Sequence, residues 1–424
     1  MTAEIAILNK SAVALAADSA VTIGEKIYNT ENKIFTISKY HPVGIMIYGN
    51  AMFMEVPWAT IIKMYRVSLG RKAMRDIAQY AEDFLKYIIQ KKFVTETQQR
   101  INIANVFFEY FRVAAARLRT EDESGLITYV NEQISLLKQL ESWPCAEKID
   151  PKDLVKKYDK EYLDSFNLTF GEVELSSKSK KILEKFAGLL LTKQTNSRSE
   201  SGIVFSGFGD EEIFPTLIEY KIDGAIDGHL KVKKGKTFDI DRNKSDATII
   251  PFAQREMVNR FMEGIDQDYQ RYIESAFRTM ILSYLDPVID KLKSTIDAKE
   301  KDVIIQSIQE TIGDFATKAR EYRRKEFVDP ILDTVASLPK EDLANMAEAL
   351  VNLTSIKRRV SAEKETVGGP IDVALISKGD GFIWIKRKHY FNPELNPYFL
   401  SNYFRDMKTP GDRNEKKGKR KKQR

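Results

Sequence analysis

Four residues near the start of the chain have the types and spacing that a self-activating hydroxyl nucleophile needs: Thr2, Asp18, Lys33 and Gly49. Removal of Met1 would leave Thr2 with a free α-amine, and this amine can act as the base for the neighbouring hydroxyl. Because the reference pKa of an α-amine is about 7.7–8.0, a useful fraction of it is neutral near pH 7. The sequence therefore predicts a nucleophile and its base on one residue.

The other three residues would support that nucleophile. A lysine ammonium favours the neutral form of a nearby amine and lowers the cost of an alkoxide, which is the role expected of Lys33. The Asp18 carboxylate would pair with this lysine and hold it in place. Gly49, at a predicted strand end, would offer its backbone N–H to an oxyanion. Taken alone, each of the four also has an ordinary interpretation, as a surface residue, a turn cap, a solvated strand end or a turn glycine.

Short apolar runs predict the strands that must position these residues. Glu4–Leu8 and Ala12–Ala17 are separated by a polar pair and predict two strands joined by a tight turn. Lys33–Ile37 alternates and is rich in β-branched residues, which predicts a third strand. Val43–Tyr48 predicts a fourth, and Gly49 follows it where the chain must turn.

The rest of the chain alternates between helical and extended patterns. Apolar residues recur at helical spacing from about Val56 to Trp143, and the resulting stripes are expected to face the core. Strand patterns return with Gly202–Phe208, and helical spacing dominates again from Gln254 to about Lys357. Gly379-Asp380-Gly381, between two apolar runs, predicts a closing hairpin. This order favours an α+β class over βαβ alternation.

The first of these blocks resembles the mature N-terminus of proteasome β-type subunits and of the related bacterial HslV peptidase. Ala16-Ala17-Asp18-Ser19 matches the motif that ends the second strand of that family, and Asp18 follows Thr2 by the family's own sixteen residues. Asn32-Lys33-Ile34-Phe35 resembles the third strand of the family. The segment 45–51 resembles the strand and turn that supply the oxyanion amide.

Two later segments extend the resemblance, and one departs from it. Residues 202–210 resemble the central strand of the family, and 368–376 resemble its late Gly-Gly turn and the strand that follows. The serine or threonine that the family places near this turn, after an aspartate, is missing. Glu363 or Glu365 would be candidate replacements for the aspartate. This departure leaves open a catalytically inactive scaffold that binds a partner.

The resemblance implies the four-layer αββα sandwich of N-terminal-nucleophile hydrolases, with large helical insertions. Its core blocks would be about 1–55, 200–265 and 340–390, and the insertions about 56–195 and 266–338. Residues 1–390 would then form one elaborated domain. An extension over 391–406 and a basic tail over 407–424 would follow it.

The implied activity is that of a threonine-type peptidase or amidohydrolase. Thr2 would attack the carbonyl of a peptide or protein substrate, Lys33 would tune its amine, Asp18 would orient Lys33, and Gly49 would receive the oxyanion. The chemistry requires no metal and no organic cofactor. The resemblance further implies a homo-oligomer and an ATPase partner.

Composition narrows the remaining classes. A single cysteine fits a reducing cytoplasm and excludes an internal disulfide, and three scattered histidines disfavour a zinc site. Neither a secretory signal nor a membrane span is expected. Residues 407–424 hold nine basic and two acidic residues, a net charge of +7 within a chain total of +6. A solvated tail is favoured there over a nucleic-acid site, because no aromatic residue interrupts the basic run from Lys416 to Arg424.

Overall fold

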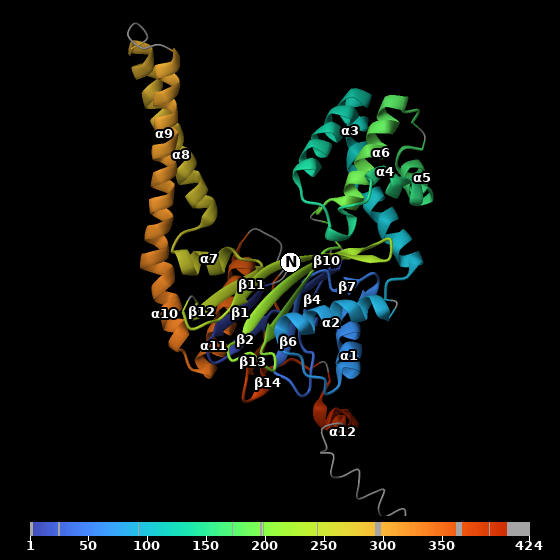
Figure 1. The fold of residues 1–424 in the computed structure, drawn as a ribbon, viewed down its shortest axis with the longest axis vertical. Helices are drawn as coiled ribbons and strands as arrows, with labels where there is room; N and C mark the ends of the chain where they lie inside the picture. Colours follow the sequence, from blue (N-terminus) through green and yellow to red (C-terminus); the bar gives the residue numbers. More distant parts are fainter. Residues whose placement is uncertain are drawn as a thin grey trace, which may run out of the picture.

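The computed structural model describes residues 3–404 except 24–25, 92, 172, 196, 198, 244, 293–297, 362–366 and 390. Two five-stranded antiparallel sheets form its centre, and helices cover them and extend away from them (Figure 1). The fold class is therefore α+β, as the order of patterns predicted. No helix of the described chain is long and apolar enough to cross a membrane.

The first sheet contains the N-terminal strand as an interior strand. Its order is β12-β1-β2-β13-β14. Every residue of β1 and β2 is buried, because both faces of this sheet are covered. The Asn9 side chain accepts hydrogen bonds from the amides of Ser11 and Ala12 and closes the predicted turn between the two strands. The strands are β1 (Ala3–Asn9), β2 (Val13–Ala17), β12 (Ala247–Ala253), β13 (Asp372–Ser377) and β14 (Gly381–Lys386).

The second sheet has the order β11-β10-β9-β6-β5. It brings the first and the central sequence blocks together, since β6 pairs with β9 over its whole length. The four strands predicted near the N-terminus are confirmed, each within one residue of the predicted bounds. The strands of this sheet are β5 (Ile34–Thr36), β6 (Val43–Gly49), β9 (Ser201–Gly207), β10 (Thr216–Ile226) and β11 (His229–Asp239). Two small hairpins pair β3 (Val21–Ile23) with β4 (Lys26–Tyr28), and β7 (Met52–Phe53) with β8 (Val56–Pro57).

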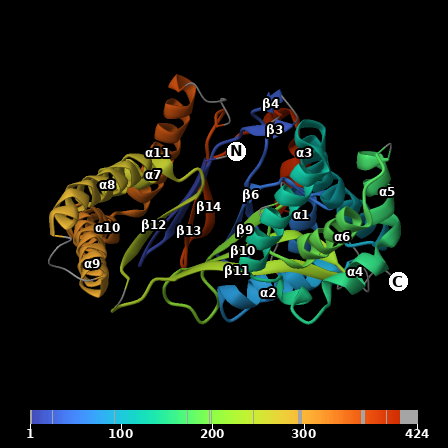
Figure 2. The ribbon, with the colours of Figure 1, turned by 90° about the horizontal axis from the view of Figure 1, so that it is seen from above.

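Three apolar clusters show how the sheets are covered. One contains residues of both sheets, such as Leu15 and Val204, and lies between them. A second joins the first sheet to α7 (Glu256–Glu263), α10 (Asp329–Ser337) and α11 (Lys340–Val360). A third joins the second sheet to α1 (Trp58–Leu69) and α2 (Ile77–Gln90). Figure 2 shows these helices on the outer sides of the two sheets.

The remaining helices between β8 and β9 build a region with a core of its own. Its aromatic stripes face that core, as predicted: Phe107 and Phe111 are completely buried. Ile226, at the end of β10, joins the same cluster and connects this region to the second sheet. The helices are α3 (Glu96–Gln139), which is interrupted at Asp122, the short η1 (Pro144–Ala146), α4 (Pro151–Lys157), α5 (Asp159–Phe170) and α6 (Ser177–Thr192).

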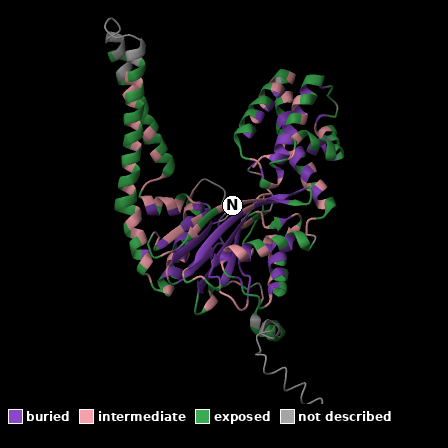
Figure 3. Ribbon diagram, viewed as in Figure 1, coloured by how far each residue is buried: buried purple, intermediate pink, exposed green. Residues whose placement is uncertain are grey.

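The helices α8 (Gln267–Leu292) and α9 (Ala298–Arg323) form a long hairpin that extends away from the sheets (Figure 1). Its described side chains are mostly exposed, in contrast to the sheets (Figure 3). A short π-helical turn, η2 (Arg324–Val328), connects the hairpin to α10. The chain ends in η3 (Pro393–Leu395) and α12 (Pro397–Phe404).

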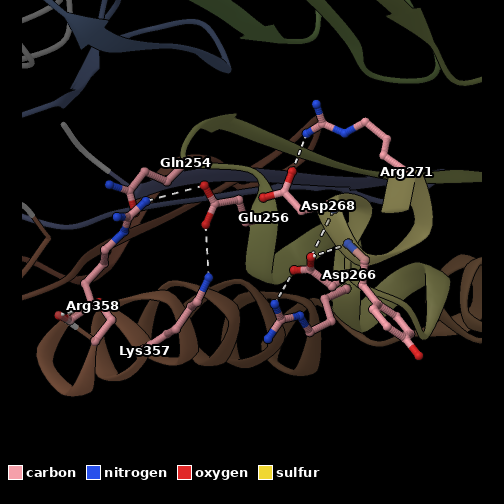
Figure 4. Close-up of polar contacts among 10 residues, drawn as sticks. Gln254, Glu256, Asp266, Asp268, Arg271, Lys357 and Arg358 are labelled. Atoms are coloured by element: carbon pink, nitrogen blue, oxygen red, sulfur yellow. Dashed lines mark hydrogen bonds and ion pairs between the residues drawn. The ribbon is translucent and has the colours of Figure 1, made fainter. Parts of the chain in front are cut away.

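Polar contacts hold the segment that leads into this hairpin, from the end of β12 to α7, against α11. Lys357 Nζ donates to Glu256 at 3.0 Å (Figure 4). Arg358 Nε donates to the Gln254 side chain at 2.7 Å. The Asp266 carboxylate accepts the amides of Asp268 and Tyr269, each at 3.0 Å, and so caps the start of α8. The Asp266 cap therefore marks where the hairpin begins.

Candidate active site

Asp18 lies immediately after β2, where the strand register places it opposite the first described residue. Glu4 pairs with Ala17 in the ladder, and the amide of Asp18 donates to the Ala3 carbonyl at 3.1 Å. In return, the Ala3 amide donates to Asp18 Oδ1 at 3.0 Å. The Asp18 side chain is completely buried. A buried carboxylate needs partners for its oxygens, and backbone donors supply them here.

Lys33 reaches the same carboxylate from the start of β5. Its Nζ lies 2.5 Å from Asp18 Oδ1, and its side chain is 7% exposed. The Lys33 carbonyl accepts the Ile47 amide at 2.9 Å, so the neighbouring strand β6 holds its backbone. Because little water reaches the pair, screening is weak and each charge fixes the position of the other.

The late Gly-Gly turn supplies a further donor that the sequence did not identify. The Gly368 amide donates to Asp18 Oδ2 at 3.0 Å, and the Gly368 carbonyl accepts the Ser19 amide at 3.1 Å. Ser19 Oγ also donates to the Pro370 carbonyl. The packing of this turn also gives its glycines a structural role, because a Cβ at Gly369, whose φ is +75°, would lie 2.7 Å from Asn29 Cβ. The turn therefore also positions the Asp18 carboxylate.

Gly49 ends β6 in a backbone conformation that only glycine adopts readily. Its φ is +82°, and a Cβ at this position would lie 2.6 Å from the Glu200 carbonyl oxygen. The next amide, that of Asn50, donates to the same oxygen at 3.1 Å. Any other side chain would push the strand end away from β9. The glycine at this position is thus required by the turn.

A cavity of about 600 Å³ connects these features, since both Lys33 and Gly49 line it. This volume lies within the range of about 300–1,000 Å³ that is typical of small-ligand pockets. One part of its wall is apolar and another is polar, the combination that binds and orients a substrate. Besides Lys33 and Gly49, the lining residues are Ala20, Val21, Thr22, Glu31, Asn32, Phe35, Ile47, Tyr48, Ala51, Trp58, Ala59 and Ala253.

Tyr48 also lines this cavity, and no sequence pattern predicted a role for it. Burial, followed by its hydrogen bond to Glu219, raises the pKa of the Tyr48 hydroxyl far above its ordinary value. The phenol therefore stays protonated at any physiological pH and donates to the buried Glu219 carboxylate. Its ring packs 5.6 Å from that of Phe252 in the space between the sheets. The strand position alone gave no signal for this role, because Glu219 lies on β10, far away in the sequence.

Of the four residues singled out from the sequence, three can be placed. Lys33 and Gly49 line one cavity, and Asp18 is ion-paired with Lys33, while the catalytic roles of all three stay predictions. Thr2 lies outside the described residues, as do Glu363 and Glu365. Among the described residues, no group of three or more His, Cys, Asp or Glu side chains could hold a metal ion.

Comparison with known proteins gives matches only at the level of structure. No family model matches the chain, and no curated protein matches it. The Anbu (Gly-1) mutant from Hyphomicrobium sp. strain MC1 is 10% identical, with 96% of this chain and 94% of that chain covered and a TM-score of 0.29. Anbu (ancestral beta-subunit) from Yersinia bercovieri is 10% identical, with 95% and 94% covered and a TM-score of 0.29. The Anbu complex from Pseudomonas aeruginosa, solved as a helical assembly, is 9% identical, with 96% of this chain and 98% of that chain covered and a TM-score of 0.29.

These comparisons correct the resemblance stated from the sequence. Assignment to the proteasome β-subunit and HslV group is wrong, because the matching solved structures are Anbu proteins and neither a family model nor a curated protein supports that group. The motif could not identify the family, and the reason is physical. Its spacing follows from the length of one strand pair and from one ion pair, and these features cannot distinguish between families that share them.

Proposed function

We propose that this chain is an N-terminal-threonine amidohydrolase that uses Thr2 as its nucleophile after removal of Met1. One observation carries the proposal: the Asp18 carboxylate joins the amide of Ala3 to the ammonium of Lys33. One peptide bond links Ala3 to Thr2, and consecutive Cα atoms lie about 3.8 Å apart. An N-terminal hydroxyl would therefore lie close to a buried lysine at the wall of a cavity.

The proposed reaction follows from these groups. The neutral Thr2 amine takes the proton of Oγ, and Oγ attacks the substrate carbonyl. The Gly49 N–H stabilises the oxyanion that forms. The amine then returns the proton to the departing nitrogen as the amide C–N bond breaks, which leaves an ester to Thr2. Water hydrolyses this ester and regenerates the hydroxyl.

Lys33 and Asp18 have supporting roles in this scheme. The ammonium favours the neutral state of the Thr2 amine and stabilises negative charge on Oγ. Asp18 acts as a positioning residue, since it accepts hydrogen bonds from Ala3, Ala20 and Gly368 as well as from Lys33. With so many donors on one carboxylate, Lys33 has little freedom to move.

The fold that we propose for this site is the four-layer αββα sandwich. Its support is the location of the apolar clusters: one between the sheets, one beneath α7, α10 and α11, and one beneath α1 and α2. In this arrangement, α1 and α2 would form an outer layer. The long hairpin α8–α9 and the region α3–α6 would be the additions to the sandwich.

The substrate that we propose is a peptide. A cavity with apolar walls at Phe35, Ile47 and Trp58 suits a side chain, and charged Glu31 and Lys33 at its edge suit a polar backbone. The homo-oligomer and the ATPase partner expected from the sequence stay predictions.

The test is covalent labelling with a peptide epoxyketone, which reacts with the hydroxyl and the amine of an N-terminal threonine. The purified full chain should carry one adduct by intact-mass spectrometry, and its unlabelled mass should lack Met1. Thr2→Ala should abolish the adduct. Thr311→Ala is the matched control, because Thr311 is exposed on α9, does not line the cavity and should leave the adduct unchanged.

Two results would refute this function. One is retention of Met1 in the native protein, which blocks the amine. The other is an adduct that persists in Thr2→Ala, or that Thr311→Ala removes. A chain without Met1 that labels with no member of a panel of epoxyketones differing in the side chain beside the warhead would favour the inactive scaffold, as would the missing serine near Gly368.

A further inference from the structure

A second cavity, of about 320 Å³, adjoins the candidate active site, because Asn32 and Phe35 line both. Its walls come from four separate parts of the chain: the segment from Asn29 to Thr36, the helix α1, Pro370 before β13, and the stretch from Trp384 in β14 up to Phe399 in α12. The late stretch has no role in the proposed hydrolysis. A cavity that it helps to close is therefore a candidate for a separate function.

The charge of this cavity has one sign. Lys63, Arg66, Arg387 and Lys388 line it together with His389, and no carboxylate is found among its described lining residues. The charge of Lys388 is matched, since its Nζ lies 2.5 Å from the buried Asp372 carboxylate. Lys63 has no carboxylate partner among the described residues, and Arg387 has only an aromatic one. A concave surface with unmatched positive charge attracts an anion.

The same walls carry aromatic rings. The Arg387 guanidinium lies 4.7 Å from the centre of the Trp384 ring, and Phe391 packs edge-on against Phe399 with ring centres 4.9 Å apart. Together with Phe35, these residues give the cavity flat apolar surfaces. A planar heterocycle stacks well on such surfaces and on a guanidinium. The side chains of Asn29 and Asn32 add groups that can both donate and accept hydrogen bonds.

We propose that this cavity binds a phosphorylated aromatic ligand of the nucleoside monophosphate kind. The base would pack against the aromatic wall around Trp384, and the phosphate would pair with Lys63 and Arg387. The volume is at the lower end of the range for small-ligand pockets, about 300–1,000 Å³, which fits a mononucleotide better than a dinucleotide. This proposal does not depend on Thr2 or on hydrolysis.

Binding can be measured on the full chain by calorimetry, with AMP, GMP, CMP and UMP at low salt. At least one of the four should bind, and binding should weaken as salt is raised. Lys63→Gln and Arg387→Gln should each weaken the bound nucleotide about tenfold, the loss expected for one charged hydrogen bond. Both side chains reach the surface, so neither change should disturb the fold.

The matched control is Lys386→Gln, which removes the same charge from the residue next to Arg387. Lys386 instead pairs with Glu348 on α11 at 2.6 Å and does not line the cavity, so affinity should stay within twofold. Thr2→Ala should also leave affinity unchanged, which separates this proposal from the proposed hydrolysis. The nucleoside of the nucleotide that binds and inorganic phosphate, each lacking one half of the ligand, should bind more weakly than that nucleotide.

Three results would overturn the proposal. The first is no binding by any of the four nucleotides at millimolar concentration. The second is equal affinity in wild type, Lys63→Gln and Arg387→Gln. The third is inorganic phosphate binding as tightly as the nucleotides, which would indicate a simple anion site with no aromatic recognition.

Discussion

Two buried lysine–aspartate pairs in the described part of the chain look alike at short range and differ in their surroundings. Lys33 Nζ lies 2.5 Å from Asp18, with side-chain exposures of 7% and 0%. Lys231 Nζ lies 2.8 Å from Asp223, with exposures of 5% and 1%. Each pair lies beside a central sheet, and a distance or burial criterion alone could not tell them apart.

The two pairs differ in what else holds the carboxylate. Asp18 accepts backbone amides, among them that of Ala3, which the strand register positions, and that of Gly368 in the late Gly-Gly turn. Asp223 instead accepts the hydroxyls of Ser197 and Ser199, each at 2.5 Å. Burial alone would raise the pKa of Asp223, but Lys231 and the serine hydroxyls outweigh it and hold the pKa of this carboxyl below its ordinary value.

They differ also in what the lysine faces. Lys33 lines the candidate catalytic cavity, whereas Lys231 Nζ lies 5.4 Å from the centre of the Trp143 ring, under the region α3–α6. The second pair thus connects that region to β10 and β11. A buried ion pair is therefore no evidence of catalysis by itself. The cavity and the proximity of the chain end distinguish the first pair from the second.

The largest expected effect tests this difference directly. Lys33→Met should slow epoxyketone labelling of Thr2 by about 10²- to 10⁴-fold, the usual contribution of a group that assists proton transfer. Lys231→Met should leave the labelling rate within about twofold in folded protein. Labelling rates from mass spectrometry, with circular dichroism to confirm folding, give the comparison. Equal losses in both variants would abolish the distinction.

Stability should respond alike at both pairs. Asp18→Asn and Asp223→Asn should each lower the free energy of unfolding by about 3–5 kcal/mol, because each leaves a buried ammonium without its partner. Urea denaturation measures both. The double variant Asp223→Leu/Lys231→Met should recover most of that loss, since an apolar pair can replace a buried ion pair. If the double variant recovers no stability, Ser197 and Ser199 need the Asp223 carboxylate as the acceptor of their hydroxyls.

A smaller effect is expected from the glycine in each region. Gly228, in the turn between β10 and β11, has a φ of +77° with open space around it, so Gly228→Ala should cost about 1–2 kcal/mol. Gly49→Ala should cost more, because its Cβ would also meet the Glu200 carbonyl. It should slow labelling as well, whereas Gly228→Ala should not. Equal unfolding midpoints in urea would contradict the close approach at Gly49.

The smallest effect is a pH dependence at the second pair. Because the pKa of Asp223 is lower in the folded chain, its contribution to stability is fully present above the unfolded value of about 3.9 and is lost as pH falls through the folded value. The stability gap between wild type and Asp223→Asn should therefore be constant from pH 7 to about pH 5 and narrow below that. Urea denaturation over this range measures the gap. A stability gap that widens as the pH falls would contradict this prediction.

Some of these features could be predicted because they are local. The strands around Asp18, Lys33 and Gly49 were predicted within one residue, since short apolar runs and adjacent turn residues specify them. The role of Gly368 could not be predicted, because 350 residues separate it from Asp18. The small strands β3, β4, β7 and β8 were also missed, as runs of two or three residues carry no periodicity.

The sequence by itself determined the class of the fold, the strands that carry the candidate site and the residue types able to do chemistry there. These properties depend on neighbours along the chain, through the alternation of apolar residues and the freedom of glycine. Only the tertiary structure decided which of two lysine–aspartate pairs faces a cavity, and which distant amides complete the Asp18 site. Those outcomes depend on sheet register and on the packing of segments hundreds of residues apart, and no local pattern encodes them.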